Sequence, residues 1–596
     1  MCVNIGWQPE TAKQREYMPA SKVLVMGDDL RSFLAVVRSL GSKGISIDTC
    51  PINQGTSALR SRYIDQIHHL PSYNYDPDNW IKRLKEILSQ NNYDLIIPCT
   101  DQFIIPIHAH AESLKDYPLA IVNDEAYETF YDKALTRELA DNCQVPIARG
   151  RLLQEGDSSE LLISLFGLPL IIKPRSSFAQ DTLFSRNRVH TVKSSDELDN
   201  LLGQIKIPDD FIVESCFPGY GAGISILAGE GEVLLAFQHQ RVHEPREGGG
   251  SSYRKSVKLN PELLRHVAAL ARATKLTGVS MFEFKINPED QAAILVEVNA
   301  RFWGSLPLAI GAGVDFPYHL YQLLVKREVP GGNGYRSNFY GRNLTNDVRC
   351  LMSNLEAIRS QSIKAVAAHV LKWSFGFCRV LIGREKIDSL SFKDPVPFIL
   401  EVKTLIWDFS LKFIRTTGVY NKAATYFTRK RFKKIWLQAE HNPIKIAVIC
   451  SGNICRSPFA AEVLKKIFQK EGIPANIKSY GLLPMEGRTS PDSAINSAQN
   501  FGIDLSSHRS TYADDDVLRQ ANIILVFDEL NVAGLSSRSK EIGHKVVKMG
   551  NLAGIGNIND PYAKDIAAFN NIYEKIFKSA EEMLNIVRKN MHSIKH

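Results

Sequence analysis

Short apolar runs alternate with polar helical segments in two separate stretches of this chain, and that alternation limits the folds open to it. The first stretch extends from "KVLVMG" (22–27) to about residue 325 and includes "YDLIIPCT", "LPLIIKP", "FIVESCF" and "AAILVEVN". The second begins at "KIAVIC" (445–450) and continues through "NIILVF" and "KVVKMG". Alternating strands and helices typically fold into a sheet with helices packed on its faces. Both stretches are therefore predicted to be α/β domains.

The chain has 596 residues, which is too many for one hydrophobic core. At about 150 residues per domain, three or four domains are expected. We place them at residues 21–120, 121–330, 331–440 and 441–596. Between the α/β stretches, the Gly- and Pro-rich "VPGGNGYRSN" is followed by helical segments that "KDPVP" interrupts. Residues 331–440 are therefore expected to form a basic helical connector.

The cysteines indicate a reducing compartment. There are nine of them, scattered and without the spacing of a zinc site, so a disulfide framework is not expected. The first residues contain no apolar core like that of a signal peptide. No run approaches the roughly 18 apolar residues that a membrane-spanning helix needs. We therefore expect a cytoplasmic protein.

The positive charge is concentrated in one run. Between residues 412 and 434 lie eight basic residues and no acidic one, which equals the whole net charge of +8; they are Lys412, Arg415, Lys422, Arg429, Lys430, Arg431, Lys433 and Lys434. A solvated linker or helix face is the first interpretation. The interleaved aromatic residues also suit a basic amphipathic segment, so residues 412–436 are a candidate for peripheral contact with the inner face of the membrane. No nucleic-acid module surrounds the run, and nucleic-acid binding is not expected.

The loop "ICSGNICRSP" (449–458) joins a predicted buried strand to a helix that begins near Pro458. Backbone N–H groups converge at such a junction and attract an anion. Cys450 and Arg456 frame the loop as Cys-x5-Arg: the dipoles and the guanidinium favour a thiolate, and the arginine can hold two phosphate oxygens. This pattern predicts phosphate transfer to sulfur. Two structural cysteines in a strand-to-helix turn are the alternative.

The neighbours of Cys450 favour the catalytic interpretation. Gly452 and Asn453 suit a left-handed turn, and Ser457 can hydrogen-bond the thiolate. The string Cys-Ser-Gly-Asn-Ile-Cys-Arg-Ser-Pro closely resembles the signature of low-molecular-weight protein tyrosine phosphatases, and "SYGL", "SSHRS" and "NIILVFDELN" follow in the order of that family. The resemblance covers about residues 442–590. One departure is Phe527, where the family commonly has methionine.

The phosphatase resemblance implies a flavodoxin-like parallel α/β fold and a phosphotyrosine protein as substrate. It also implies the roles of individual residues. Cys450 would be the nucleophile and Cys455 a second thiol that can pair with it under oxidation. Asp560, in "NDPY", would be the general acid.

A predicted hairpin, "MFEFKINPEDQAAILVEVNAR", carries a second candidate site. Glu297 and Asn299 are two apart on one strand and therefore share a face, which Glu283 on the preceding strand can join. Two carboxylates and an amide oxygen suit Mg²⁺ carrying a nucleoside triphosphate. Arg301 follows on the same face. A solvated acidic sheet face is the alternative, but the apolar neighbours favour a deeply set strand pair.

These residues resemble the metal site of the ATP-grasp superfamily, in particular carbamoyl-phosphate synthase and other carboxylate–amine ligases, over residues 21–325. The resemblance implies a pre-ATP-grasp Rossmann-like domain at 21–120 and an ATP-grasp domain at 121–330. It implies ATP, with Mg²⁺ or Mn²⁺ on Glu283, Glu297 and Asn299. The nucleotide would lie against Lys133, Lys173, Glu214, the backbone near Cys216 and Phe217, and Gln238, His239 and Arg241.

The implied reaction joins a small carboxylate to an amine or similar nucleophile. The carboxylate attacks the γ-phosphate of ATP, and Arg301 would stabilise the resulting acyl-phosphate. Two departures from the family stand out: "PRSSFAQDTLFSRN" after Lys173 has no glycine, and Gly221 stands where a ribose-binding carboxylate is usual.

We therefore expect a bifunctional enzyme in which an ATP-grasp ligase is joined to a phosphatase. One alternative is that only the phosphatase is catalytic and the ATP-grasp region is a nucleotide sensor. Another is that this region is a docking module, through which the phosphatase acts on membrane kinases of surface-polysaccharide synthesis.

Overall fold

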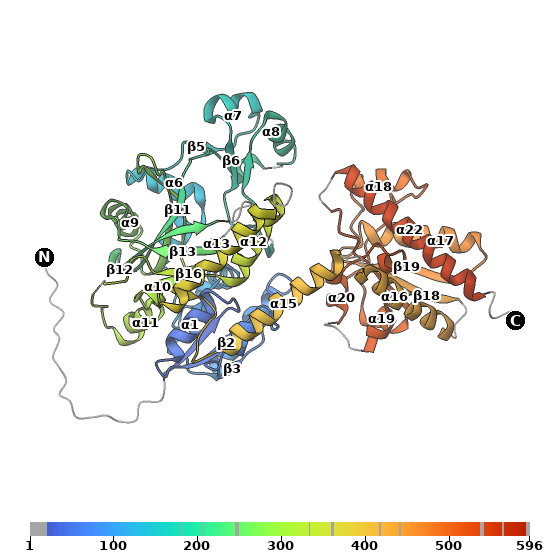
Figure 1. Ribbon diagram of the computed structural model, residues 1–596, viewed down its shortest axis with the longest axis horizontal. Helices are drawn as coiled ribbons and strands as arrows, with labels where there is room; N and C mark the ends of the chain where they lie inside the picture. The colour runs from blue at the N-terminus through green and yellow to red at the C-terminus, as the bar shows by residue number, and fades with distance from the viewer. Residues whose placement is uncertain are drawn as a thin grey trace. The chain divides into compact units, whose positions relative to one another are not determined.

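The computed structural model describes residues 21–179, 182–205, 207–244, 250–332, 334–358, 363–416, 419–439, 443–536, 541–562 and 565–591. It divides the chain into two compact units, Met1–Leu405 and Ile406–His596 (Figure 1). Within the described ranges, no helix combines the length and the hydropathy that crossing a membrane requires.

The first unit opens with a four-stranded parallel sheet in the order β3-β2-β1-β4. Its strands are β1 (Lys22–Met26), β2 (Ser46–Cys50), β3 (Gln66–Ile67) and β4 (Leu95–Pro98). Val23 and Val25 face a core that includes α1 (Ser32–Gly41), whereas Leu24 and Met26 face α2 (Pro77–Gln90) and α3 (Asp101–Ala109). β1 and β4 are apolar on both faces because helices cover both. The short η1 (Ser57–Arg60) and α4 (Ala111–Leu114) complete this part.

A smaller sheet, ordered β5-β10-β6-β9, follows in the chain. It contains β5 (Gly150–Leu152), β6 (Leu170–Pro174), β9 (His190–Val192) and β10 (Phe211–Ser215), and it shares a core with α7 (Ser159–Phe166) and α8 (Ser195–Leu202). Helices α5 (Asp124–Tyr131) and α6 (Lys133–Asn142) precede it. The hairpin of β7 (Phe178–Ala179) and β8 (Thr182–Arg186) occupies the stretch without glycine, and η2 (Pro208–Asp210) leads into β10.

The largest sheet has seven strands in the order β15-β14-β11-β12-β13-β16-β17. The strands are β11 (Tyr220–Gly229), β12 (Glu232–His243), β13 (Tyr253–Ser256), β14 (Gly278–Ile286), β15 (Ala293–Asn299), β16 (Tyr340–Arg342) and β17 (Glu385–Ile387). One face packs on α9 (Pro261–Ala273). The other contributes to the core that holds α10 (Leu306–Ala312) and α11 (Phe316–Tyr321), which η3 (Gln322–Lys326) follows.

The stretch 331–440, expected to be a separate connector, is shared between the two units. Its first part supplies β16 and β17, where buried Arg342 donates to Glu385 at 2.6 Å. Its helices are α12 (Leu344–Ile358), α13 (Ile363–Gly376), α14 (Cys378–Leu381), α15 (Val396–Thr416) and α16 (Val419–Gln438). The boundary between the two units therefore follows Leu405 and lies within this stretch. The first part belongs to the first unit because its short strands β16 and β17 complete the large sheet.

Helix α16, which carries much of the basic run, is part of the second unit. Phe432 and Trp436, one helical turn apart, are buried in the core of that unit. Arg429 donates to the Leu552 carbonyl at 2.8 Å and pairs with Glu582. These side chains are not free to lie on a membrane. The side chains of residues 411–421, which include the first part of the basic run, lie outside the described residues.

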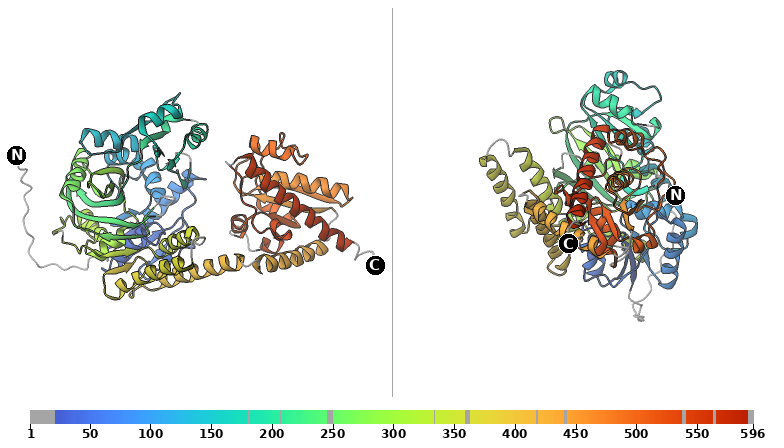
Figure 2. Two further views of the ribbon diagram at one scale, coloured as in Figure 1. Left: turned by 45° about the horizontal axis from the view of Figure 1, so that its top comes forward. Right: turned by 90° about the vertical axis from the view of Figure 1, so that its right-hand side faces the viewer.

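The second unit is a parallel sheet in the order β19-β18-β20-β21. Its strands are β18 (Ile444–Cys450), β19 (Ala475–Gly481), β20 (Ile523–Val526) and β21 (Val546–Lys548). α17 (Arg456–Lys470), α18 (Asp492–Gln499) and α22 (Ile566–Met591) share one core with it, and α19 (Asp515–Gln520) and α20 (Glu529–Ser536) share the other (Figure 2). The short η4 (Glu541–Lys545) and α21 (Met549–Leu552) flank β21. The expected α/β class, with a parallel C-terminal sheet, is confirmed.

Candidate active sites

The loop between β18 and α17 forms the centre of the C-terminal site. β18 ends at Cys450 and α17 begins at Arg456, so the loop lies at the carboxyl edge of the sheet. β18 pairs with β19 on one side and with β20 on the other, so the strand order reverses at β18. Ligands of open parallel α/β sheets bind at such a topological switch point. Asn453 turns the loop with a φ of 53°, in the left-handed region expected from the sequence.

A hydrogen-bond network surrounds the Cys450 thiol. Its Sγ lies 3.0 Å from Oγ of Ser457 and accepts from the Asn453 backbone N–H at 3.2 Å. The Asn453 side chain in turn donates to Ser457 Oγ at 2.9 Å, and that oxygen lies 3.2 Å from the Tyr480 carbonyl. All three side chains are buried. The network fixes the position of the sulfur and supplies donors to a thiolate.

Arg456 is 1% exposed and lies between two carboxylates. Nη1 donates to Asp528 at 2.5 Å and to the Ile558 carbonyl at 2.9 Å, while Nη2 donates to Asp560 at 2.6 Å. Burial opposes the charge, but Asp560 and Cys450 outweigh it and raise the pKa of Arg456. Its Nε is buried and has no hydrogen-bond partner within the described residues. That N–H remains available to a bound oxyanion.

Cys455 has different surroundings, although it lies in the same loop. Burial, and then the charge of Asp560, raise the pKa of the Cys455 thiol. Its carbonyl accepts from the Tyr573 hydroxyl at 3.1 Å. Cys455 therefore contributes a protonated thiol at neutral pH.

Four further polar residues that the sequence did not single out contact the loop. Arg488 donates to the Gly452 carbonyl at 2.7 Å, and Nε2 of His508 lies 2.7 Å from the Asn453 carbonyl. Asn531 donates to Ser451 at 3.3 Å, and Asp528 binds Arg456. Asp528 and Asn531 directly follow a predicted strand, a position that could have identified them. His508 lies in "SSHRS", a string that the phosphatase resemblance includes, whereas no comparable signal marks Arg488. The Phe527 ring, the departure noted above, lies 5.5 Å from the Arg456 guanidinium carbon.

The expected metal ligands of the first unit lie on one face of the large sheet. Glu283 of β14 stands opposite Glu297 of β15, and Met281 stands opposite Asn299. The Asn299 amide donates to Glu283 at 3.3 Å. Two carboxylates and an amide side chain are a donor set that fits Mg²⁺. The sequence expectation that these three side chains share a face therefore agrees with the register.

Two arginines hold this cluster. Arg241 donates to Glu283 at 2.5 Å. Burial and then Glu297 raise the pKa of Glu283, while Arg241 opposes the shift. Arg301 donates to Asp101 at 2.5 and 2.9 Å and to Asn299 at 2.9 Å. Asp101 begins α3, so a residue of the N-terminal sheet domain contributes to the site; the sequence contained no signal for it.

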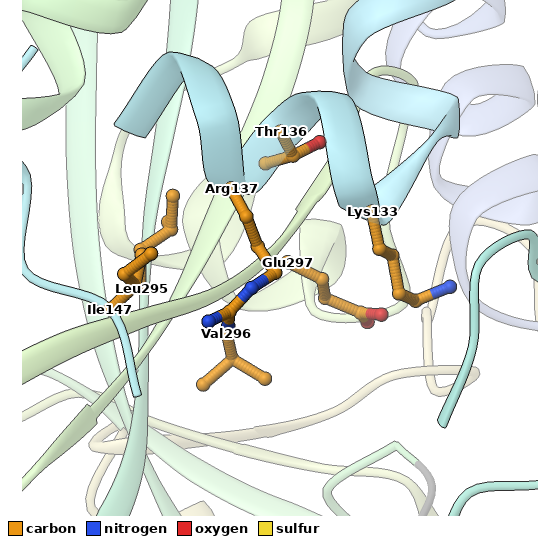
Figure 3. A pocket seen from close by; sticks show the side chains of 7 residues that line it. All are labelled: Lys133, Thr136, Arg137, Ile147, Leu295, Val296 and Glu297. Atoms are coloured by element: carbon orange, nitrogen blue, oxygen red, sulfur yellow. The ribbon is translucent and has the colours of Figure 1, made fainter. Parts of the chain in front are cut away.

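The two lysines expected to bind the nucleotide have different partners. Lys173 Nζ lies 2.8 Å from the Glu214 carboxylate, to which Arg137 also donates at 3.0 Å. Lys133 donates to Ser177 at 3.1 Å. Figure 3 shows Lys133 and Glu297 pointing into a common space beside Arg137, around a cavity of about 10 Å³, enough for one water molecule. Arg137 is a further residue that sequence reasoning missed.

The backbone expected at the adenine follows β10. Cys216 and Phe217 are half-buried, and the Phe217 carbonyl accepts from Lys285 at 3.3 Å. An open pocket of about 530 Å³ begins next to them; it is lined by Pro218, Gly219, Tyr220, Arg241, Val242, Glu244, Asn287, Pro288 and Glu289. A Cβ on Gly221 would lie 2.3 Å from the Glu244 carboxylate. The glycine at the expected ribose position therefore leaves room for a carboxylate from the neighbouring strand.

Gln238 and His239, both expected beside the nucleotide, lie on opposite faces of the large sheet. Gln238 pairs in register with Ile224, on the face that packs against α9, and accepts from the Asn260 backbone at 2.7 Å. His239 is on the same face as Arg241 but is buried, 3.4 Å from Ser305, and its Nδ1 has no partner among the described residues. Burial, then Arg241 and Arg254, lower the pKa of His239 to about 3. Adjacent strand residues face opposite sides of a sheet, so at most one could face the nucleotide.

Comparison with known proteins identifies relatives of two regions of the chain. Residues 445–593 match the model of the low molecular weight phosphotyrosine protein phosphatases. A probable low molecular weight protein-tyrosine-phosphatase, EpsP of Ralstonia nicotianae, is 30% identical over 144 residues, which is 24% of this chain and 95% of that protein. The chain belongs to the low-molecular-weight protein tyrosine phosphatase family. The phosphatase unit also resembles Vibrio vulnificus Wzb in complex with benzylphosphonate, at 29% identity and a TM-score of 0.22, over 23% of this chain and 94% of that one.

Residues 208–338 match a second model, described as ATP-grasp in the biosynthetic pathway with Ter operon. A biotin carboxylase domain of Hydrogenobacter thermophilus 2-oxoglutarate carboxylase aligns at 16% identity and a TM-score of 0.44, over 54% of this chain and 74% of that one. The expected fusion is confirmed: an ATP-grasp region precedes a low-molecular-weight phosphatase.

Proposed function

We propose that the chain is a bifunctional enzyme: a cysteine-dependent phosphotyrosine protein phosphatase and an ATP-dependent carboxylate–amine ligase. The phosphatase rests on one observation above all. The Cys450 sulfur accepts from the Asn453 backbone N–H and shares its site with the buried Arg456, whose Nε–H has no partner among the described residues. That arrangement suits a phosphoryl group in transfer to sulfur.

In the proposed reaction, the Cys450 thiolate attacks phosphorus and the bond to the tyrosine oxygen breaks. Arg456 holds two phosphoryl oxygens, and Asn453 and Ser457 keep the sulfur in line. Asp560 donates a proton to the departing phenolate. Water then attacks the cysteinyl phosphate, with Asp560 as the base, and releases inorganic phosphate.

Hydrolysis of a phosphotyrosine peptide tests this proposal. Cys450→Ser should abolish turnover, because a hydroxyl supplies no appreciable anionic nucleophile near neutral pH. Cys455→Ser should retain most of it, because the buried Cys455 thiol is protonated. Equal losses in both variants would show that the nucleophile is misassigned.

The ligase proposal rests on the carboxylate cluster and its surroundings. Glu283, Glu297 and Asn299 would hold Mg²⁺, which would offset charge on the transferred phosphoryl group. Arg301, anchored by Asp101, would hold the acyl-phosphate for attack by an amine or similar nucleophile. Arg241 now pairs with Glu283, so it would turn toward the phosphates when metal binds.

The proposed nucleotide lies between the two sheets of the ATP-grasp region. Lys133 and Lys173 would bind its phosphates, and the backbone of Cys216 and Phe217 its adenine. Glu244 could accept from the ribose hydroxyls across Gly221. Glu214 would position Lys173 through their 2.8 Å ion pair.

ATP consumption tests the ligase. The full chain is incubated with Mg-ATP and a panel of small carboxylic acids and amines, and ADP and inorganic phosphate are measured. Acid-dependent ADP release that Glu297→Gln abolishes would support the ligase. Tight ATP binding without turnover by any acid would support the nucleotide sensor instead.

A further inference from the structure

One face of α15 is apolar and exposed. Within the first unit, Pro397, Glu401 and Leu405 face inward and are buried. The opposite side presents Val396, 45% exposed, and Ile399, 57% exposed, and Phe392 just before the helix is 94% exposed. The α15 face is defined here as Phe392, Lys393, Val396, Ile399 and Lys403.

Between residues 379 and 405, the acidic side chains are buried and several basic ones are exposed. All four acidic residues between 379 and 405 are buried and hydrogen-bonded; they are Glu385 with Arg342, Asp388 with Arg254, Asp394 with Arg38, and Glu401 with Thr345. Three basic residues of the same stretch are exposed: Arg384, Lys393 and Lys403. Exposed Arg62 also reaches the Lys393 carbonyl, at 3.4 Å. The surface is therefore both apolar and positive.

Further exposed apolar side chains lie just before this face in the chain. Leu381 and Ile382, where α14 ends, are 87% and 68% exposed, and Phe375 of α13 is 72% exposed. Single apolar residues on a surface are normal, whereas a contiguous exposed apolar patch is typical of an interaction site.

The charge favours a lipid surface over a protein partner. Lysine is depleted at protein interfaces, whereas apolar side chains flanked by lysine and arginine are typical of helices that lie in a membrane interface. Basic residues close to a membrane surface are attracted to the anionic lipids in that membrane.

We propose that the α15 face docks the chain on an anionic membrane. Phe392, Val396 and Ile399 enter the boundary between headgroups and acyl chains, and Lys393 and Lys403 contact lipid phosphates. This proposal moves the membrane contact from residues 412–436, where Phe432 and Trp436 are buried, to the end of the first unit.

Vesicle flotation of the full chain tests the proposal. The chain should float with vesicles of phosphatidylcholine and phosphatidylglycerol but not with phosphatidylcholine alone, and added salt should release it. The double variant Phe392→Ser/Ile399→Ser should weaken binding by at least about tenfold, because it removes two apolar side chains that would enter the bilayer. Lys393→Gln/Lys403→Gln should weaken binding and flatten its salt dependence.

Two matched controls should leave binding unchanged. Val329→Ser replaces another exposed apolar residue, 69% exposed, of the same unit. Lys430→Gln/Lys433→Gln/Lys434→Gln neutralises exposed charges of α16. Retained phosphatase activity and unfolding temperature would show that the α15 variants are folded.

Three outcomes would overturn the proposal. One is no binding to anionic vesicles even at low salt. Another is binding that only the α16 variant reduces. The third is a wild-type dimer that binds no vesicles and that Phe392→Ser/Ile399→Ser converts to a monomer, which would make the face an interface between copies.

Discussion

Nη2 of Arg456 lies 2.6 Å from Oδ2 of Asp560, so the side chain expected to bind phosphate is paired with the one expected to protonate the leaving group. An incoming phosphate competes with the carboxylate for the same guanidinium. Substrate binding would thus release Asp560 from this ion pair.

Asp560→Asn tests that role through the leaving group. A positioned acid typically contributes about 10²–10⁴-fold to such a step. We expect a loss of this size for phosphotyrosine and a much smaller loss for aryl phosphates whose phenols are strongly acidic, because those leave without a proton. Steady-state rates over a series of aryl phosphates measure the difference. A uniform loss across the series would mean that Asp560 only positions Arg456.

Asp528→Asn tests the second partner of Arg456. The substitution removes a buried charge at 2.5 Å from Nη1 while Asp560 and the Ile558 carbonyl still bind the guanidinium. We expect a loss of about 1–3 kcal/mol in the stability of the phosphatase unit and weaker inhibition by inorganic phosphate. Asp516→Asn, which breaks an exposed pair with Arg519, is the control and should change neither. Unchanged phosphate inhibition would place Asp528 outside the site.

Glu297→Gln should weaken Mg²⁺-dependent nucleotide binding by at least about tenfold, or about 1.4 kcal/mol, and leave the phosphatase untouched. The reason is its position opposite Glu283, where it completes the pair of carboxylates. Titration of a fluorescent ATP analogue with and without Mg²⁺ provides the measurement. Glu262→Gln, on the exposed surface of α9, is the matched control. If both variants bind alike, the metal lies elsewhere.

His239 makes the first unit sensitive to acid. The folded protein holds its pKa near 3, against an ordinary value of 6.5, so between these values the unfolded chain binds one more proton. Stability therefore falls as pH falls through this window, by about 1.4 kcal/mol per pH unit. His239→Gln should remove this slope even if it lowers stability at pH 7. Unfolding temperatures at several pH values measure it, and His69→Gln, which is exposed, should keep the wild-type slope.

Local patterns predicted the parts of both sites that are local in sequence. The loop around Cys450 needs only a strand, a turn and a helix, and the pairing of Glu297 with Asn299 follows from the alternation of a strand. The contact between Asp101 and Arg301 could not be predicted in this way. The two residues are 200 apart in the chain, and their contact depends on how the N-terminal sheet domain packs against the ATP-grasp region. Arg488 likewise reaches Gly452 from a loop with no distinctive pattern.

Besides the bounds of the connector, two expectations differ from the structure, and both differences have physical explanations. Gln238 was grouped with His239, although neighbours on a strand face opposite sides, and its side chain serves the turn before α9. The basic run was interpreted as a linker or an amphipathic segment from its charges and its interleaved aromatic residues. The side chains that decide the placement of α16 are Phe432 and Trp436, which share one helical face.

The ion pair between Arg301 and Asp101 determines how the chain can be dissected. A fragment that begins at residue 121 would lack Asp101, so Arg301 would lose its main counter-charge. The ATP-grasp region is therefore expected to need the N-terminal sheet domain to fold. The phosphatase unit, by contrast, contains its own core together with α16, so a fragment from residue 419 onward should fold and turn over substrate alone. A fragment for the phosphatase alone should therefore include α16, and a fragment for the ligase alone should include β16 and β17.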